Sequence, residues 1–167
     1  MKSPLVSLLI LLTAFYLTIT AILFFTQSYF IFFPQEISGN QHSFLKQFKS
    51  NEITLDHDGI SLHGWFIQNE TNPENPLIIY YGGNAEEVSM NLYNLDKFGD
   101  RSLLFMNYRG YGKSEGRPGQ DALFSDALFI FDHISKKYHI PPEKIILKGR
   151  SLGSAVAIHV AGQRKVK

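Results

Sequence analysis

The sequence predicts an α/β fold that follows one apolar helix. Between residues 51 and 167, short apolar runs rich in β-branched residues alternate with longer segments of helical periodicity. This alternation is typical of a largely parallel sheet that is covered by helices on both faces. Residues 3–35, by contrast, contain no charged residue and no histidine, so a different structure is predicted for them.

The overall composition excludes several classes of protein. The 16 Lys and Arg residues nearly balance the 15 Asp and Glu residues, and the 44% hydrophobic content argues for packed structure rather than disorder. A near-neutral chain is not a nucleic-acid binder that works by bulk charge. The absence of cysteine excludes a disulfide, a thiolate nucleophile and a cysteine-ligated metal. No spacing of histidines and acids suggests a metal site, and nothing requires a cofactor.

The uncharged segment predicts a membrane anchor. Residues 4–33 are longer than the roughly 20 apolar residues that span a bilayer, so we expect residues 1–34 to form a single-pass anchor. The alternative is a cleaved signal peptide, which has an apolar stretch of about 7–15 residues and a small-x-small cleavage site, and no Ala-x-Ala precedes Pro34. Lys2 favours a cytoplasmic start, whereas the lysines of residues 46–49 favour the reverse. We expect an extracytoplasmic globular part.

The remaining elements are predicted in chain order. Residues 35–50 are expected to be a linker, and residues 51–167 an α/β domain. An antiparallel hairpin is predicted for residues 53–55 and 60–67, because apolar alternation flanks the turn-forming Asp58-Gly59. Buried strands and flanking helices then alternate, with strands at 76–81, 103–106 and 144–147 and helices at 84–98, 122–138 and 152–161.

One turn contains the predicted chemistry. Gly149-Arg150-Ser151-Leu152-Gly153 is a G-x-S-x-G pattern directly after an apolar strand and directly before a helix. Glycine is needed at both flanks, Gly149 and Gly153, because side chains would collide in so tight a turn, and Ser151 is then raised as the candidate nucleophile. The backbone N–H of Leu152 would stabilise an oxyanion. The alternative is a glycine-rich cap between strand and helix.

A second oxyanion donor is predicted in the loop after an earlier strand. Tyr81-Gly82-Gly83-Asn84 follows the strand at 76–81, and a glycine pair lets backbone amides approach a ligand. Gly83 or Asn84 would supply the N–H. The alternative is an ordinary strand-to-helix connection in which Asn84 caps the helix.

Three ordered motifs resemble those of membrane-anchored α/β-hydrolases of the serine-aminopeptidase or prolyl-oligopeptidase-like branch. They are residues 82–87 (GGNAEE), 107–116 (NYRGYGKSEG) and 149–154 (GRSLGS), and the resemblance covers about residues 50–167. It implies the N-terminal part of an α/β-hydrolase sheet and an acyl-serine at Ser151, formed from an ester, thioester or amide of a small molecule or peptide. Where that family often has His-Gly, this chain has Tyr81-Gly82-Gly83.

The middle motif superficially matches a phosphate-binding loop. Gly112-Lys113-Ser114 lacks the required glycine at position 107, and Glu115-Gly116-Arg117-Pro118 replaces the helix that should follow, so nucleotide binding is not expected. The resemblance instead implies that Arg109 and Tyr111 hold this loop structurally.

The acid and histidine of a serine hydrolase triad are not evident. In this fold they follow the serine in the order acid, then histidine, but no Asp or Glu follows Ser151. His159 lies two helical turns on, about 12 Å along the axis, too far to act as base. The earlier histidines are expected at surface or sheet-edge positions, namely His57, His63, His133 and His139.

We therefore expect an N-terminal fragment of a hydrolase that lacks a C-terminal half and is inactive alone. We expect the strand before Ser151 to lie centrally in the sheet, and an unpaired sheet edge beyond it to be exposed. Two alternatives stay open. The chain is a non-enzymatic, membrane-anchored scaffold or binding protein, or it is a small enzyme that uses an unrelated base such as His133.

Overall fold

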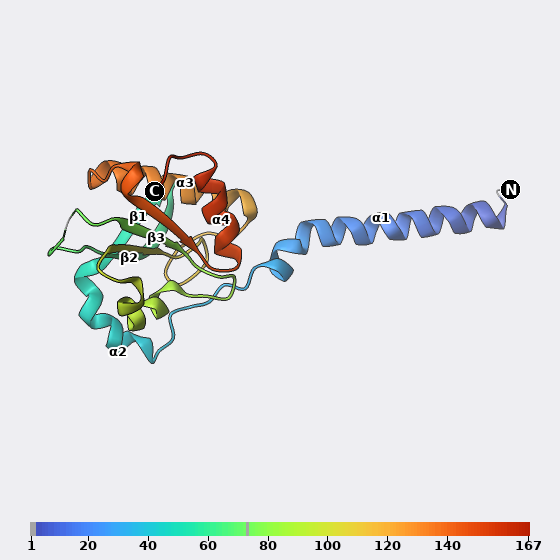
Figure 1. Ribbon diagram of the computed structural model, residues 1–167. Helices are drawn as coiled ribbons and strands as arrows, with labels where there is room; N and C mark the ends of the chain where they lie inside the picture. Colours follow the sequence, from blue (N-terminus) through green and yellow to red (C-terminus); the bar gives the residue numbers. More distant parts are fainter. Residues whose placement is uncertain (1–2, 73) are drawn as a thin grey trace. The chain divides into compact units, whose positions relative to one another are not determined.

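The computed structural model describes residues 3–72 and 74–167, and the chain divides into two compact units, Met1–Phe33 and Pro34–Lys167 (Figure 1). The first unit is one helix, α1 (Pro4–Ile31), whose N-terminus is capped by the Ser3 hydroxyl. The hydroxyls of Thr18 and Thr26 donate to carbonyl groups four residues earlier, at 2.8 and 2.7 Å. Their polar atoms are thus satisfied without water. α1 is long and apolar enough to cross a membrane.

The second unit is built on a five-stranded mixed sheet. Its strands are β1 (Glu52–His57), β2 (Ile60–Ile67), β3 (Leu77–Tyr81), β4 (Ser102–Met106) and β5 (Ile145–Gly149), in the spatial order β1-β2-β4-β3-β5. β1 and β2 are antiparallel, β2 and β4 are antiparallel, and β3 pairs in parallel with both β4 and β5. The predicted α/β class, with an antiparallel hairpin before parallel strands, is confirmed.

Local sequence explains the hairpin. Asp58 and Gly59 have φ angles of 54° and 75°, which a tight two-residue turn requires. In β1, Ile53 and Leu55 are buried while Thr54 between them is exposed. This period of two places one face of the strand against the core.

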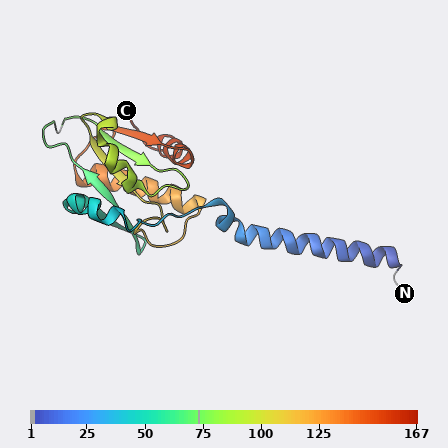
Figure 2. The same cartoon turned by 90° about the horizontal axis from the view of Figure 1, so that it is seen from below.

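Helices cover both faces of the sheet (Figures 1 and 2). On one face lie α3 (Gln120–Lys137) and α4 (Leu152–Ala161). The other face is covered by α2 (Gln41–Leu45), the 3₁₀ helix η1 (Lys46–Asn51) and the 3₁₀ helix η2 (Val88–Phe98), and a short 3₁₀ turn, η3 (Pro142–Lys144), precedes β5. On this second face a cluster of buried side chains fills the core: Leu45, Trp65, Ile78, Tyr80, Val88, Leu92, Phe98, Leu103 and Phe105.

Two predictions about this second layer are wrong. The predicted helix at 84–98 begins at Val88 as a 3₁₀ helix and has non-helical angles at Asn94. Its cap is Glu87 rather than Asn84, because the Asn84 side chain accepts a hydrogen bond from Tyr111. Residues 35–50, expected to be a linker, instead contain α2 and most of η1, and bury Leu45 in the core. Tertiary contacts overrode local sequence preference in both places.

β5 lies at the edge of the sheet. The expectation that this strand is central is wrong within the described residues, whereas the expected open edge beyond it is confirmed. Ile146 and Leu147 are half-buried, in contrast to the fully buried residues of β3. The backbone N–H of Lys167 donates to the Ile145 carbonyl at 3.0 Å, at the start of this edge. Within the part of the chain that the structure describes, no strand pairs with β5 on this side.

His63 is buried on the core side of β2, so its predicted surface or sheet-edge position is wrong. Its ring meets Trp65 edge to face, with centroids 4.7 Å apart. Burial, together with the ammonium group of Lys113, lowers the pKa of His63 to about 4. For the adjacent Glu52, burial alone would raise the pKa of the carboxyl group. Hydrogen bonds from Lys113 and Lys49 outweigh this effect and lower the pKa of Glu52 to about 2.

The chain is expected to lose stability in mild acid because of His63. The unfolded chain takes up a proton below the ordinary pKa of 6.5, whereas the folded chain does so only near pH 4, so stability falls as the pH drops through this window. Between pH 7 and pH 5 the loss is about 2 kcal/mol. Urea unfolding followed by the fluorescence of Trp65, the single tryptophan, measures it.

His63→Phe keeps an aromatic ring beside Trp65 and should abolish this loss between pH 7 and pH 5. His139→Asn, at an exposed position with a φ of 53°, should keep it. Glu52 does not contribute in this range, because its stabilisation is lost only as the pH falls from 4.5 toward 2. Equal pH dependence in His63→Phe and the unmodified chain would contradict the prediction.

Candidate active site

Ser151 lies, as predicted, in the turn between β5 and α4. Its φ and ψ angles are 51° and −116°, a region that side-chain-bearing residues rarely adopt and that costs on the order of 1–3 kcal/mol. The residue is exposed, and its side chain does not cap the helix. We call residues 149–153 the elbow. The strained backbone holds a serine hydroxyl free of the helix that follows.

The two glycines of the elbow are required by close backbone contacts. A Cβ atom at Gly149 would lie 2.2 Å from the Gly153 carbonyl oxygen. A Cβ atom at Gly153 would lie 2.0 Å from the Tyr81 carbonyl oxygen. Neither contact can relax by moving a flexible side chain. The structure therefore explains both glycines by sterics, as the sequence predicted.

Leu152 is the first residue of α4. The N–H groups of the first helical turn have no intrahelical acceptor, and they lie at the positive end of the helix dipole. The next two N–H groups are satisfied within the turn, since Gly153 donates to Arg150 at 2.9 Å and Ser154 donates to Ser151 at 2.8 Å. The Leu152 N–H is therefore a suitable donor to a negative oxygen next to Ser151.

The loop after β3 lies directly against the elbow. We call residues 82–86 the oxyanion loop. The Arg150 N–H donates to the Tyr81 carbonyl at 3.1 Å, which joins the ends of β3 and β5. The Gly83 N–H, however, donates to the Glu86 carboxylate at 2.7 Å. That amide therefore already has a charged acceptor, and the predicted second donor stays either Gly83 or Asn84.

Glu86 is a functional candidate that sequence reasoning missed. The residue is buried, and its carboxylate accepts hydrogen bonds from four groups. The donors are the Tyr80 hydroxyl at 2.9 Å, the Gly83 N–H at 2.7 Å, the Asn91 amide at 2.8 Å and the Arg150 guanidinium at 3.2 Å. Burial and the adjacent carboxylate raise the pKa of Tyr80. The signal available in the sequence was that Glu86 lies three positions after Gly83, within hydrogen-bonding reach of its amide.

The middle motif holds the oxyanion loop from the other side. The Tyr108 hydroxyl donates to the Gly82 carbonyl at 2.9 Å, and the Tyr111 hydroxyl donates to the Asn84 side chain at 3.0 Å. Arg109 points elsewhere and forms a fork with the Asp126 carboxylate of α3, at 2.6 and 2.7 Å. Arg109 and Tyr111 thus make structural contacts, the kind of role that the resemblance implied for them.

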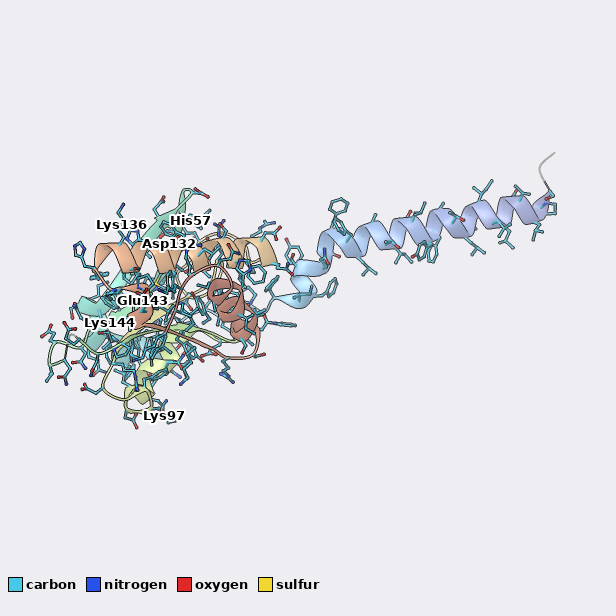
Figure 3. The ribbon with its side chains drawn as sticks, turned by 45° about the horizontal axis from the view of Figure 1, so that its top comes forward. His57, Lys97, Asp132, Lys136, Glu143 and Lys144 are labelled. Carbon is cyan, nitrogen blue, oxygen red and sulfur yellow. The ribbon has the colours of Figure 1, made fainter. Side chains whose placement is uncertain are left out.

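No histidine of residues 3–72 and 74–167 has a hydrogen bond to Ser151. His159 stacks on Phe124 with ring centroids 4.0 Å apart, as expected for a half-buried helix residue. His57 lies beside α3 (Figure 3) and bonds to Asp126 at 2.6 Å. That pair resembles part of a triad, but β1 and β5 are four strand spacings apart, about 19 Å. Proton transfer across that distance is excluded.

A cavity of about 750 Å³ adjoins the elbow. Arg150 and Glu86 line it together with Met90 and Tyr93 of η2 and residues of the 35–41 segment. Its lining combines amide, carboxylate and apolar side chains. Among the described residues, no group of three or more acids and histidines could hold a metal ion.

The mixed sheet with helices on both faces is similar to the fold of solved α/β-hydrolases, as comparisons with known proteins show. No family model matches the chain. It is 35% identical over 102 residues to "Alpha/beta hydrolase domain-containing protein WAV2" of Arabidopsis thaliana, covering 59% of this chain and 33% of that protein. It is 36% identical over 114 residues to "Uncharacterized membrane protein YNL320W" of Saccharomyces cerevisiae, covering 66% of this chain and 39% of that protein.

Solved structures show the same architecture. An α/β-hydrolase from Vibrio vulnificus matches with a TM-score of 0.65 at 24% identity, over 76% of this chain and 46% of that one. The Pyrococcus furiosus esterase Pf2001 matches with a TM-score of 0.58 at 22% identity, over 78% of this chain and 50% of that one. These likenesses show that the chain shares the fold of these α/β-hydrolases. The chain spans between a third and two fifths of the length of the curated relatives described above.

Proposed function

We propose that this chain carries the nucleophile and the oxyanion donors of a membrane-anchored serine hydrolase that cleaves ester, thioester or amide bonds. The geometry of Ser151 carries the proposal. Its hydroxyl is exposed on a strained turn between two glycines that cannot accept a Cβ atom. A simple cap between strand and helix has no need of this strain, whereas a nucleophile elbow requires it.

In the proposed reaction the Ser151 oxygen attacks the carbonyl carbon and gives up its proton to a base. The oxyanion forms beside the N–H group of Leu152 and a second N–H group, that of Gly83 or Asn84, in the 82–86 loop. Collapse breaks the bond to the leaving group, which takes the proton, and water then releases the acyl group from the serine. Among the described residues, neither a histidine nor a carboxylate forms a hydrogen bond with the Ser151 hydroxyl. We infer that base and acid come from a segment equivalent to the part of the relatives that this chain does not cover.

The chain alone is expected to react slowly and to be rescued by a small external base. The purified full chain in detergent micelles is treated with a fluorophosphonate probe, with and without imidazole. Imidazole should accelerate modification, because it replaces the missing general base, and peptide mass spectrometry should locate the adduct on Ser151.

Ser151→Ala should remove the imidazole-dependent adduct entirely. The neighbouring Ser154 is the internal control, since its hydroxyl donates to the Gly149 carbonyl at 3.2 Å and it lies inside the helix. Equal modification of both serines would contradict a specific nucleophile. Rapid labelling of Ser151 without imidazole would contradict the inference that the chain lacks a general base. No labelling under either condition would favour the non-enzymatic scaffold.

We propose in addition that α1 anchors the chain in a membrane with the remaining residues extracytoplasmic. Its 28 residues are sufficient to span a bilayer, and none of its side chains is buried within the protein. The chain should stay with the membrane fraction in alkaline carbonate and keep its N-terminal residues. Release into the soluble fraction, or loss of residues 1–34, would identify a signal peptide.

A further inference from the structure

Glu86 physically joins the oxyanion loop to the elbow. Its Oε2 atom accepts the Gly83 N–H at 2.7 Å and the Arg150 guanidinium at 3.2 Å, so one oxygen contacts both segments. Its Oε1 atom is held by Tyr80 and Asn91. A carboxylate with donors on both oxygens is fixed in orientation and is well placed to fix the loop.

The same carboxylate creates an electrostatic problem for the proposed reaction. It lies next to the residues predicted to stabilise an oxyanion, and a negative charge there opposes the charge that develops on the substrate. Within residues 3–72 and 74–167, the one cation that forms an ion pair with Glu86 is Arg150, the residue immediately before the nucleophile. The guanidinium therefore lies where it can offset the carboxylate charge.

We propose that Glu86 and Arg150 act as a positioning pair, in which the Glu86 carboxylate fixes the oxyanion loop and the Arg150 guanidinium compensates its charge beside Ser151. This inference rests on the proposed hydrolase function. The elbow requires no particular side chain at Arg150, because this residue contacts β3 through its backbone N–H. The inference gives the Arg150 side chain a role of its own. The guanidinium is 69% exposed, so its removal should cost the fold little.

The first test measures the rate at which the fluorophosphonate modifies Ser151 in the presence of imidazole. Arg150→Ala should slow this rate by roughly tenfold, because the uncompensated carboxylate opposes charge on the phosphoryl oxygen. Arg150→Lys retains a cation and should stay within about threefold of the unmodified chain. A general effect on folding would lower both variants alike, so this pair separates charge from structure.

The second test is a double-mutant cycle. If Arg150 acts by compensating Glu86, Arg150→Ala should have almost no effect in a Glu86→Gln background, where no charge remains to compensate. Equal slowing in both backgrounds would overturn the proposal. An unchanged rate in the single Arg150→Ala variant would overturn it as well, and that variant does not depend on whether Glu86→Gln folds.

The third test observes the Gly83 amide without any chemistry at Ser151. Hydrogen exchange measured by NMR should show protection of this amide in the full chain and faster exchange in Glu86→Gln. Glu87→Gln is the matched control, because Glu87 is also buried but accepts hydrogen bonds from Asn107 and Ser89 instead of Gly83. The control should leave Gly83 exchange unchanged.

The outcomes separate this inference from the proposed function. If Ser151 is never modified, the hydrolase proposal fails, and Gly83 exchange alone decides whether Glu86 fixes the loop. If Ser151 is modified and both Arg150 variants react like the unmodified chain, the hydrolase proposal stands and the positioning pair is overturned. Equal Gly83 exchange in Glu86→Gln and Glu87→Gln would also overturn it.

Discussion

Gly153→Ala is expected to destabilise the protein by more than about 3 kcal/mol. The new Cβ atom would lie 2.0 Å from the Tyr81 carbonyl oxygen and 2.6 Å from that of Gly82, and both are backbone atoms that cannot rotate away. The elbow and the oxyanion loop must then separate. Urea unfolding followed by Trp65 fluorescence measures the stability, and imidazole-dependent labelling of Ser151 should be lost with it.

Gly162→Ala is the matched control for this variant. It lies at the end of the same helix with a φ of −72°, and a Cβ atom there would make ordinary contacts of 3.5 Å. Its effect should stay within about 0.5 kcal/mol. Similar stability of the two alanine variants would show that the elbow is looser than the structure indicates.

Asp126→Ala is expected to cost about 3 kcal/mol. The Asp126 carboxylate is buried and accepts a fork from Arg109 and a hydrogen bond of 2.6 Å from His57. Its removal leaves the mostly buried Arg109 guanidinium without its ion-pair partner and frees the 107–116 loop from α3. Thermal or urea unfolding of the full chain measures the loss.

Asp132→Ala tests whether burial of the ion pair, rather than its two-hydrogen-bond geometry, sets the loss of stability expected for Asp126→Ala. Asp132 lies on the same helix (Figure 3). It forms a fork with Arg164 at 2.7 and 2.7 Å, but its side chain is 51% exposed. An exposed pair of this kind contributes at most about 1 kcal/mol. If Asp132→Ala and Asp126→Ala cost the same, burial is not the deciding factor.

The elbow could be predicted because its determinants are local. An apolar strand, two glycines around a serine and a helix follow one another directly in residues 145–161, and sterics alone then dictate the turn. The hairpin at Asp58-Gly59 was predictable for the same reason. The type and start of η2 were not, since Asn84 is diverted by Tyr111, which lies 27 residues away. The burial of His63 likewise depends on neighbours that are distant in sequence.

By itself, the sequence determined the α/β class, the apolar helix and the position of Ser151, because these follow from hydrophobic periodicity and from the sterics of neighbouring residues. Only the tertiary structure decided that β5 lies at the sheet edge, that Glu86 occupies the Gly83 amide and that Arg150 pairs with Glu86. These arrangements depend on hydrogen bonds and charges between segments that the fold brings together. The type of a side chain determines which hydrogen bonds and ion pairs it can form. The fold determines which partner it finds, because the fold decides which segments become neighbours.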